Sequence, residues 1–295
     1  STDQCALKGT SVLIKCEYDY PSGLVVTGVA WYQRQRISGL VHLSKIRSAP
    51  DHFRYVGNKW SNCSLRINDV QSSDAREYYF QFKTTLNNKW LSQRPALLTV
   101  TELTAFVEPS TVTEGDCVNL ACVSGCPSHV DVVWFKDGQP VANPIFQARR
   151  EDAGRYYCAV QGQEMIRSAS VALNVQYAPR KVSLSVSPSS EVLKGSAVTF
   201  TCSSDANPTV THNGYSLHKD GHLISSGVGS GQVLSLPSME VNHTGLYLCQ
   251  ARNTVGETNS TEVLLTISSV LFLAGVGVFL FIALVLTVFF FWLVP

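Results

Sequence analysis

The chain has 295 residues, with 23 Lys and Arg against 22 Asp and Glu, so its formal net charge is +1. This balance argues against a nucleic-acid binder, which needs a basic surface to displace counterions from phosphates. Hydrophobic residues make up 45% of the chain, enough to bury packed cores and therefore atypical of a disordered protein. The nine cysteines indicate an oxidising compartment.

Residues 1–267 repeat one pattern three times: an alternating apolar strand that ends in Cys, a strand with a large core residue, and a later x-Gly-x-Tyr-x-Cys. Alternation places the two cysteines on the inward faces of two facing sheets, with a Trp packed against their bridge. The Tyr two positions before the second Cys supplies a corner hydrogen bond. The pattern therefore predicts an all-β fold of three tandem immunoglobulin-like β-sandwiches.

The first copy, residues 1–101, departs from this pattern. Cys16 and Trp31 stand where expected, but Phe80 occupies the place of the second Cys. The missing partner is Cys63, on the preceding strand, and in this sandwich the strands of Cys16 and Cys63 are neighbours in one sheet. We therefore expect a Cys16–Cys63 disulfide within a sheet, two sheets that sit further apart, and Phe80 in the space between them.

The second copy, residues 102–177, has Cys122, Trp134 and Cys158 in the usual places and predicts a Cys122–Cys158 disulfide. Trp134 and Cys158 are only 24 positions apart, so the strands between them must be abbreviated. Residues 145–148 are the expected remnant.

The third copy, residues 178–267, predicts a Cys202–Cys249 disulfide. Leu217 replaces the expected Trp, and His243 replaces the expected Asp. A core can repack around both replacements, so the predicted fold is unchanged.

Residues 270–294 contain no charged residue, and this stretch exceeds the roughly 20 residues that a helix needs to cross a membrane. We predict a transmembrane helix over residues 268–295. Three N-glycosylation sequons precede it, at Asn62, Asn242 and Asn259. Together with the cysteines they place residues 1–267 outside the cell, as in a single-pass type I protein of the plasma membrane.

The displaced pair Cys16 and Cys63 resembles the arrangement in the Siglecs, the sialic-acid-binding immunoglobulin-like lectins, and most closely the B-cell co-receptor branch of that family. Residues 16–23, 177–181 and 202–208 support the resemblance. It covers residues 1–267 and implies one variable-type domain followed by two constant-type domains.

In that family an arginine one position after Phe80 holds the sialic acid carboxylate, because a guanidinium donates two parallel hydrogen bonds to it. Here the position is Gln81, which carries no charge. Alternation places Tyr79, Gln81 and Lys83 on one outward face. Family members also pack the sugar against a tryptophan of the next strand, and the spacing matches Trp90. The resemblance thus implies a ligand site of Tyr79, Gln81, Lys83 and Trp90; ordinary solvent-facing strand residues are the alternative.

Cys5, Cys117 and Cys126 remain outside the three core bridges. The resemblance implies that Cys126 ties the second domain to the first, with Cys5 as its partner. Cys117 is then unpaired or available to another chain, in a disulfide-linked dimer.

Cys117, Cys122, Cys126 and His129 are also spaced as in a zinc knuckle. Since Cys122 is assigned to Cys158 and an extracellular site favours disulfides, we expect no metal. We also expect no cofactor and no enzymatic activity, because neither a zinc-protease motif nor a nucleophile elbow occurs.

The sequence therefore predicts a Siglec-type cell-surface receptor, embedded in the membrane, that recognises a ligand through its first domain in immune-cell adhesion or regulation. Gln81 favours a protein ligand such as a cell-surface glycoprotein. A sialylated glycan bound by Gln81, Lys83 and Trp90 is the alternative, and nucleic acid is not expected as a partner.

Overall fold

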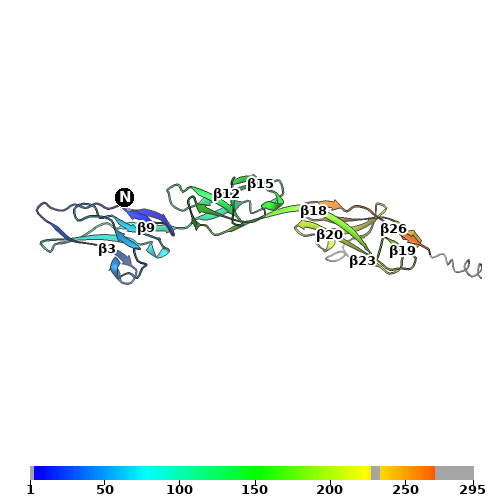
Figure 1. Cartoon of the computed structure of the whole chain (residues 1–295), viewed down its shortest axis with the longest axis horizontal. Coiled ribbons are helices and arrows are strands. Elements are labelled where there is room, and N and C mark those ends of the chain that lie inside the picture. The colour runs from blue at the N-terminus through cyan, green and yellow to red at the C-terminus, as the bar shows by residue number, and fades with distance from the viewer. Residues whose placement is uncertain (1–2, 227–232, 270–295) are drawn as a thin grey trace, which may run out of the picture. The chain divides into compact units, whose positions relative to one another are not determined.

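The computed structural model describes residues 3–226 and 233–269 (Figure 1). Across these residues every regular element is a β-strand or a single turn of 3₁₀ helix. The chain divides into two units, residues 1–175 and 176–295, which are described separately. The predicted span over residues 270–294 lies outside the described residues. Within the described ranges no helix is long and apolar enough to cross a membrane.

The first segment, residues 4–101, consists of two sheets. The larger sheet has the order β1 (Gln4–Leu7), β9 (Ala96–Thr101), β7 (Glu77–Thr84), β3 (Val26–Gln35) and β4 (Gly39–His42), with β8 (Lys89–Leu91) paired to β7. The smaller sheet has the order β2 (Val12–Ile14), β6 (Leu65–Ile67) and β5 (Phe53–Tyr55). Inward residues alternate with exposed ones and pack into one core, with Ile14, Leu65 and Tyr78 almost fully buried.

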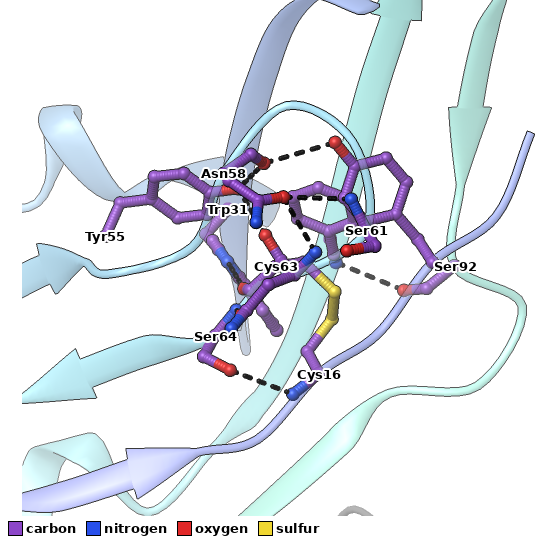
Figure 2. Close-up of a disulfide and its surroundings, with 11 residues drawn as sticks. Cys16, Trp31, Tyr55, Asn58, Ser61, Cys63, Ser64 and Ser92 are labelled. Atoms are coloured by element: carbon purple, nitrogen blue, oxygen red, sulfur yellow. Dashed lines mark hydrogen bonds between the residues drawn. A yellow bond between two sulfur atoms is a disulfide. The ribbon is translucent and has the colours of Figure 1, made fainter.

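The disulfide of the first segment lies within the smaller sheet (Figure 2). It joins Cys16, after β2, to Cys63, before β6, and the Cys63 N–H donates to the Cys16 carbonyl at 2.9 Å. Trp31 of β3 donates its indole N–H to the Cys63 carbonyl at 2.9 Å. Phe80 pairs with Trp31 across β3 and β7, and their ring centroids are 5.5 Å apart. An aromatic ring therefore occupies the place of an inter-sheet bridge.

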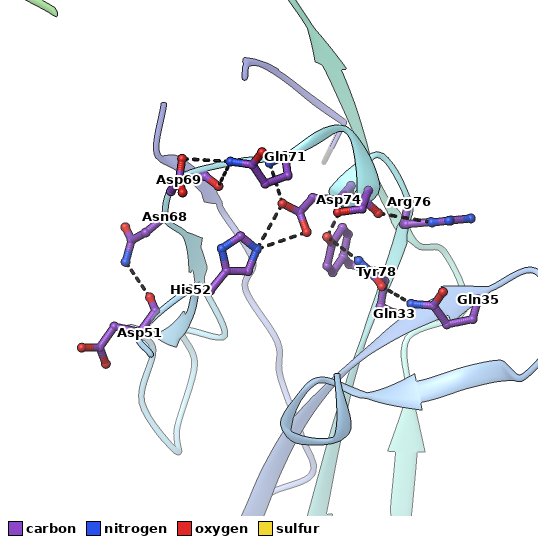
Figure 3. Close-up of polar contacts among 11 residues, drawn as sticks. Gln33, Gln35, Asp51, His52, Asn68, Asp69, Gln71, Asp74, Arg76 and Tyr78 are labelled. Carbon is purple, nitrogen blue, oxygen red and sulfur yellow. Dashed lines mark hydrogen bonds and ion pairs between the residues drawn. The ribbon is translucent and has the colours of Figure 1, made fainter. Parts of the chain in front are cut away.

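A buried polar cluster closes the other end of this core (Figure 3). His52 Nε2 lies 3.1 Å from both carboxylate oxygens of Asp74, and both side chains are buried. Asp74 also accepts the Gln71 N–H at 2.8 Å, and its carbonyl accepts the Tyr78 hydroxyl at 3.0 Å. Gln33 donates to the Tyr78 oxygen at 2.8 Å. Burial raises the pKa of Tyr78, since the apolar surroundings disfavour a phenolate.

The second segment, residues 102–175, again has two sheets. One contains β10 (Thr104–Glu108), β12 (Cys117–Val123) and β15 (Ile145–Gln147). The other contains β14 (Gln139–Val141), β13 (Val132–Lys136), β16 (Gly154–Val160), the start of β18 (Val171–Ser187), β11 (Thr111–Thr113) and β17 (Gln163–Arg167). The Cys122–Cys158 disulfide joins the sheets, and Trp134 pairs with Cys158. The short β15 lies at the expected remnant, between Trp134 and Cys158.

The third segment, residues 176–268, repeats this arrangement. One sheet contains the remainder of β18, β20 (Val198–Asn207) and β23 (Val233–Leu236). The other contains β19 (Glu191–Leu193), β26 (Val263–Ser268), β24 (Gly245–Arg252), β21 (Tyr215–Lys219), β22 (His222–Ser226) and β25 (Glu257–Asn259). Leu217 pairs with Cys249 of the Cys202–Cys249 disulfide and is buried in the Trp position.

Within residues 3–226 and 233–269, five 3₁₀ turns connect the strands: η1 (Leu43–Lys45), η2 (Ser72–Asp74), η3 (Arg150–Asp152), η4 (His212–Gly214) and η5 (Val241–His243). Three of these turns precede a corner tyrosine. The hydroxyls of Tyr78, Tyr156 and Tyr247 donate to carbonyls four residues upstream, at 3.0, 2.8 and 2.8 Å. The repeated motif of the sequence therefore corresponds to a repeated turn in the structure.

The first and second segments share contacts within their common unit. Leu7 of β1 is buried in the core of the second segment, and Cys5 forms a disulfide with Cys126. Lys8 pairs with Glu102 at 2.8 Å. Cys117 of β12 is exposed and free, so it does not take part in these links.

Candidate ligand-binding face

The larger sheet of the first segment presents one side to solvent, which we call the outer face. Trp31 and Phe80 point inward, so their neighbours in β3 and β7 point outward. Residues that pair across neighbouring strands lie on the same side of the sheet, so the outward residues of β3, β4, β7 and β8 share this face. The outer face consists of Gly28, Ala30, Tyr32, Arg34, Leu40, His42, Glu77, Tyr79, Gln81, Lys83, Lys89 and Leu91.

Tyr79 lies on this face but is covered by charged neighbours. Its side chain is only 8% exposed. The Arg34 guanidinium lies 5.2 Å from its ring centroid and donates to its hydroxyl at 2.8 Å. That hydroxyl donates to Glu77 at 3.0 Å, and Glu77 pairs with Arg34 at 2.6 Å. The hydrogen bond to Tyr79, together with the Glu77 charge, raises the pKa of Arg34. The positive charge of Arg34 is therefore already compensated.

Gln81 is half-buried in the middle of the outer face. Its Oε1 accepts the Tyr32 hydroxyl at 3.1 Å, which orients the amide. The Tyr32 ring packs edge-on against His42, with centroids 5.3 Å apart. Among the described residues no acceptor lies within hydrogen-bond distance of the Gln81 NH₂, so this group is available to a ligand as a neutral donor.

Trp90 does not lie with Gln81, which corrects the grouping made from the sequence. In the register of β7 and β8, Trp90 pairs with Phe82 and stacks on it, with centroids 5.0 Å apart and planes at 14°. Phe82 is buried in the core, so Trp90 packs at the edge of that core and points away from the outer face. The cross-strand neighbour of Gln81 is Leu91, which is 41% exposed.

Lys83 and Lys89 lie opposite each other on β7 and β8, and both are exposed. Within the described ranges no carboxylate lies within 4 Å of either ammonium group. They form the positively charged end of the outer face.

Sequence reasoning missed Tyr32, Arg34 and Leu91. The signal for the first two was present, because alternation from the inward Trp31 directs positions 32 and 34 outward. The role of Leu91 depends on the pairing register of β7 and β8, which spacing alone does not determine.

The residues with zinc-knuckle spacing include Cys122 and Cys126, and each of these two is part of a disulfide. The described residues contain no group of three or more His, Cys, Asp or Glu that could hold a metal ion. The three sequon asparagines, Asn62, Asn242 and Asn259, are all exposed.

Comparison with known proteins identifies the domains. The immunoglobulin V-set domain family matches residues 4–101, and the immunoglobulin domain family matches residues 101–175 and 181–267.

Three curated relatives are Siglecs. The B-cell receptor CD22 of Mus musculus is 33% identical over 172 residues, which cover 54% of this chain and 18% of the relative. Myelin-associated glycoprotein of Homo sapiens is 25% identical, with 87% of this chain and 46% of the relative covered. Sialic acid-binding Ig-like lectin 13 of Pan troglodytes is 26% identical, with 69% and 60% covered. The chain thus spans at most 60% of the length of these relatives. With its all-β immunoglobulin-like domains, the chain belongs to the immunoglobulin superfamily, and its similarity to these relatives makes it Siglec-like.

Proposed function

We propose that the chain is a single-pass cell-surface receptor that binds a protein ligand through the outer face, in immune-cell adhesion or regulation. In this proposal residues 1–101, 102–177 and 178–267 are three extracellular immunoglobulin-like domains and residues 268–295 span the plasma membrane. The ligand is a cell-surface glycoprotein recognised through its polypeptide.

The observation that carries the proposal is the chemistry around Gln81. A sialic acid carboxylate is bound most strongly by the two parallel donors and the charge of an arginine. Gln81 offers one neutral amide, and the nearby Arg34 is already bonded to Glu77 and Tyr79. Trp90, the expected platform for a sugar, packs against Phe82.

The remaining surface has the composition of a protein interface. Leu40 and Leu91 are 37% and 41% exposed, on either side of the half-buried Tyr32 and Gln81. Partly exposed aliphatic and aromatic groups surrounded by hydrogen-bonding side chains are typical of protein contact surfaces.

Cell binding tests this proposal. The full chain, displayed on transfected cells, is offered to a panel of immune cells that are treated with sialidase or left untreated. Leu91→Asp should abolish binding, because it buries a charge in the interface. Leu193→Asp is the matched control, since Leu193 is 51% exposed in the third segment. Sialidase should leave binding unchanged.

The lectin alternative makes the opposite prediction. If sialidase abolishes binding and Gln81→Ala does the same, the ligand is a sialylated glycan and the proposal fails. Gln81→Arg restores the family's ionic anchor and should create a sialidase-sensitive component that the natural chain lacks.

Glycosylation and dimerisation are tested on the same cells. Enzymatic removal of N-glycans should increase the gel mobility of the chain. Each of the three Asn→Gln changes, at positions 62, 242 and 259, should lower the apparent mass by the mass of one glycan.

Cys117 is exposed on β12 and available to a second chain. A Cys117-linked dimer should run at twice the monomer mass without reductant; a monomer alone would refute it.

A further inference from the structure

Three lysines from different parts of the first segment meet at the start of β3. Lys83 of β7 pairs with Gly28 on one side and with Lys89 of β8 on the other. Lys59, in the loop between β5 and β6, donates to the Thr27 carbonyl at 3.4 Å. Thr27 in turn donates its hydroxyl to the Lys83 carbonyl at 3.4 Å. Lys59 and Lys83 are therefore next to residues 27 and 28, and Lys89 lies opposite Lys83 on the next strand.

This charge has no internal counterpart. Strands β3, β4 and β8 contain no Asp or Glu. Strand β7 contains Glu77, which is paired with Arg34. Glu17 and Asp19 precede β3, but neither forms an ion pair with these lysines in the described part of the chain. Like charges directly opposite each other on a sheet are destabilising. The Lys83–Lys89 pair therefore costs stability that a bound anion would recover.

The surface between the lysines is open. A Cβ atom at Gly28 would meet no other atom within 4 Å. The absence of a side chain at Gly28 leaves room beside Lys83 for a ligand group to approach the sheet.

The loop that carries Lys59 is held in one conformation (Figure 2). Asn58 Oδ1 accepts the backbone N–H groups of Trp60, Ser61 and Asn62 at 3.1, 2.9 and 2.9 Å. The Tyr55 hydroxyl donates to the Asn58 carbonyl at 2.6 Å. A loop ordered before binding loses little conformational entropy when a ligand arrives.

The chemistry of the three groups identifies the class of ligand. An ammonium is a compact point charge that pairs with any anionic oxygen, and it lacks the planar fork by which Arg favours a carboxylate. Three separated ammonium groups match a chain with repeated negative charges. Trp60, next to Lys59, is 69% exposed and offers an apolar ring surface to a sugar.

We propose that Lys59, Lys83 and Lys89 form an anion-binding site for a sulfated glycan chain. The site adds a second class of ligand to the protein ligand proposed above. Lys83 and Lys89 lie at the end of the outer face, beyond Gln81, and Lys59 lies in the loop between β5 and β6.

Binding of the purified full chain to immobilised heparin, with and without chemical desulfation, tests the site. The natural chain should bind heparin at low salt and lose binding as salt screens the charges. Lys83→Gln combined with Lys89→Gln should weaken binding about tenfold, from the loss of two exposed ionic contacts. Lys15→Gln combined with Lys45→Gln removes the same charge at two other exposed positions of this segment and should leave binding unchanged.

Lys83→Glu distinguishes a lost site from a lost fold. It places opposite charges across β7 and β8, so the melting temperature should stay the same or rise while heparin binding falls. Cell binding reports the protein-ligand proposal and heparin binding reports this site, so failure of the one and failure of the other give different results.

Four outcomes would overturn the site: no binding of the natural chain to heparin, equal loss in the Lys15/Lys45 control, equal binding to desulfated heparin, or equal lysine-dependent binding to polyglutamate. The last would assign the lysines to an acidic protein instead of a glycan.

Discussion

Replacing Phe80 tests what holds the two sheets of the first segment together. In this segment the disulfide lies within one sheet, so no covalent bond crosses the core at the Phe80 position. Phe80 is 5% exposed, with ring centroids 5.5 Å from Trp31 and 5.0 Å from Tyr18. Phe80→Ala should therefore leave a cavity between the sheets.

The expected loss in the free energy of unfolding is about 3–5 kcal/mol, the usual range for a buried Phe→Ala change. This equals the contribution of the neighbouring disulfide, for which a sequence separation of 47 gives about 4 kcal/mol in the chain-entropy model. Phe80→Leu retains most of the volume and should cost roughly 1 kcal/mol.

Guanidinium unfolding of the full chain, followed by tryptophan fluorescence, measures the loss. Hydrogen exchange in peptides from β3 and β7 assigns it to the first segment. Phe106→Ala is the control, because Phe106 is 43% exposed in the second segment and should change stability by no more than about 0.5 kcal/mol. If Phe80→Ala costs no more than this control, the ring does not hold the sheets together.

Three further predictions concern stability. Asp74→Ala leaves His52 and the Gln71 N–H without their acceptor and should cost about 1–3 kcal/mol in chemical unfolding, with Asp74→Asn milder; equal costs would contradict this. Leu7→Ala should lower the stability of the second segment by about 2–4 kcal/mol in hydrogen exchange of β12 and β16, although Leu7 belongs to β1; an effect confined to the first segment would exclude its role in that core. Burial raises the pKa of Tyr55 and of Tyr156 to about 12, so both favour the folded state below the unfolded value near 10, and unfolding curves should show stability falling between pH 10 and 12. Tyrosinate absorbance that is almost fully developed by about pH 11 in the folded chain, as it would be with every tyrosine pKa near 10, would contradict that shift.

Most of the fold could be predicted from the sequence because buried strands have a period of two. Alternation from Cys16, Trp31 and Phe80 assigns inward and outward residues within each strand correctly. The within-sheet disulfide could also be predicted, because Cys63 and Cys16 belong to strands that are neighbours in every sandwich of this type.

The position of Trp90 could not be predicted, because it depends on the turn between β7 and β8. Thr84 accepts the Asn87 N–H at 3.0 Å, Asn88 accepts the Thr84 N–H at 3.1 Å, and Asn87 has φ of +59°. This turn pairs Phe82 with Trp90, whereas a shift of one residue would move Trp90 to the outer face. The pairing of Arg34 with Glu77 and the burial of Leu7 likewise depend on contacts between distant parts of the chain, which local patterns do not specify.

The Asn62 sequon has a consequence for the order of events during biosynthesis. Asn62 is exposed, but Cys63 is fully buried in a disulfide and the Ser64 hydroxyl accepts the Cys16 N–H at 3.3 Å. A glycosyltransferase must read all three residues as an extended, accessible peptide. Any glycan on Asn62 must therefore be attached before Cys16 and Cys63 form their disulfide. Disulfide formation and glycosylation thus compete kinetically at residues 62–64. Slower disulfide formation should give a larger glycosylated fraction at this position.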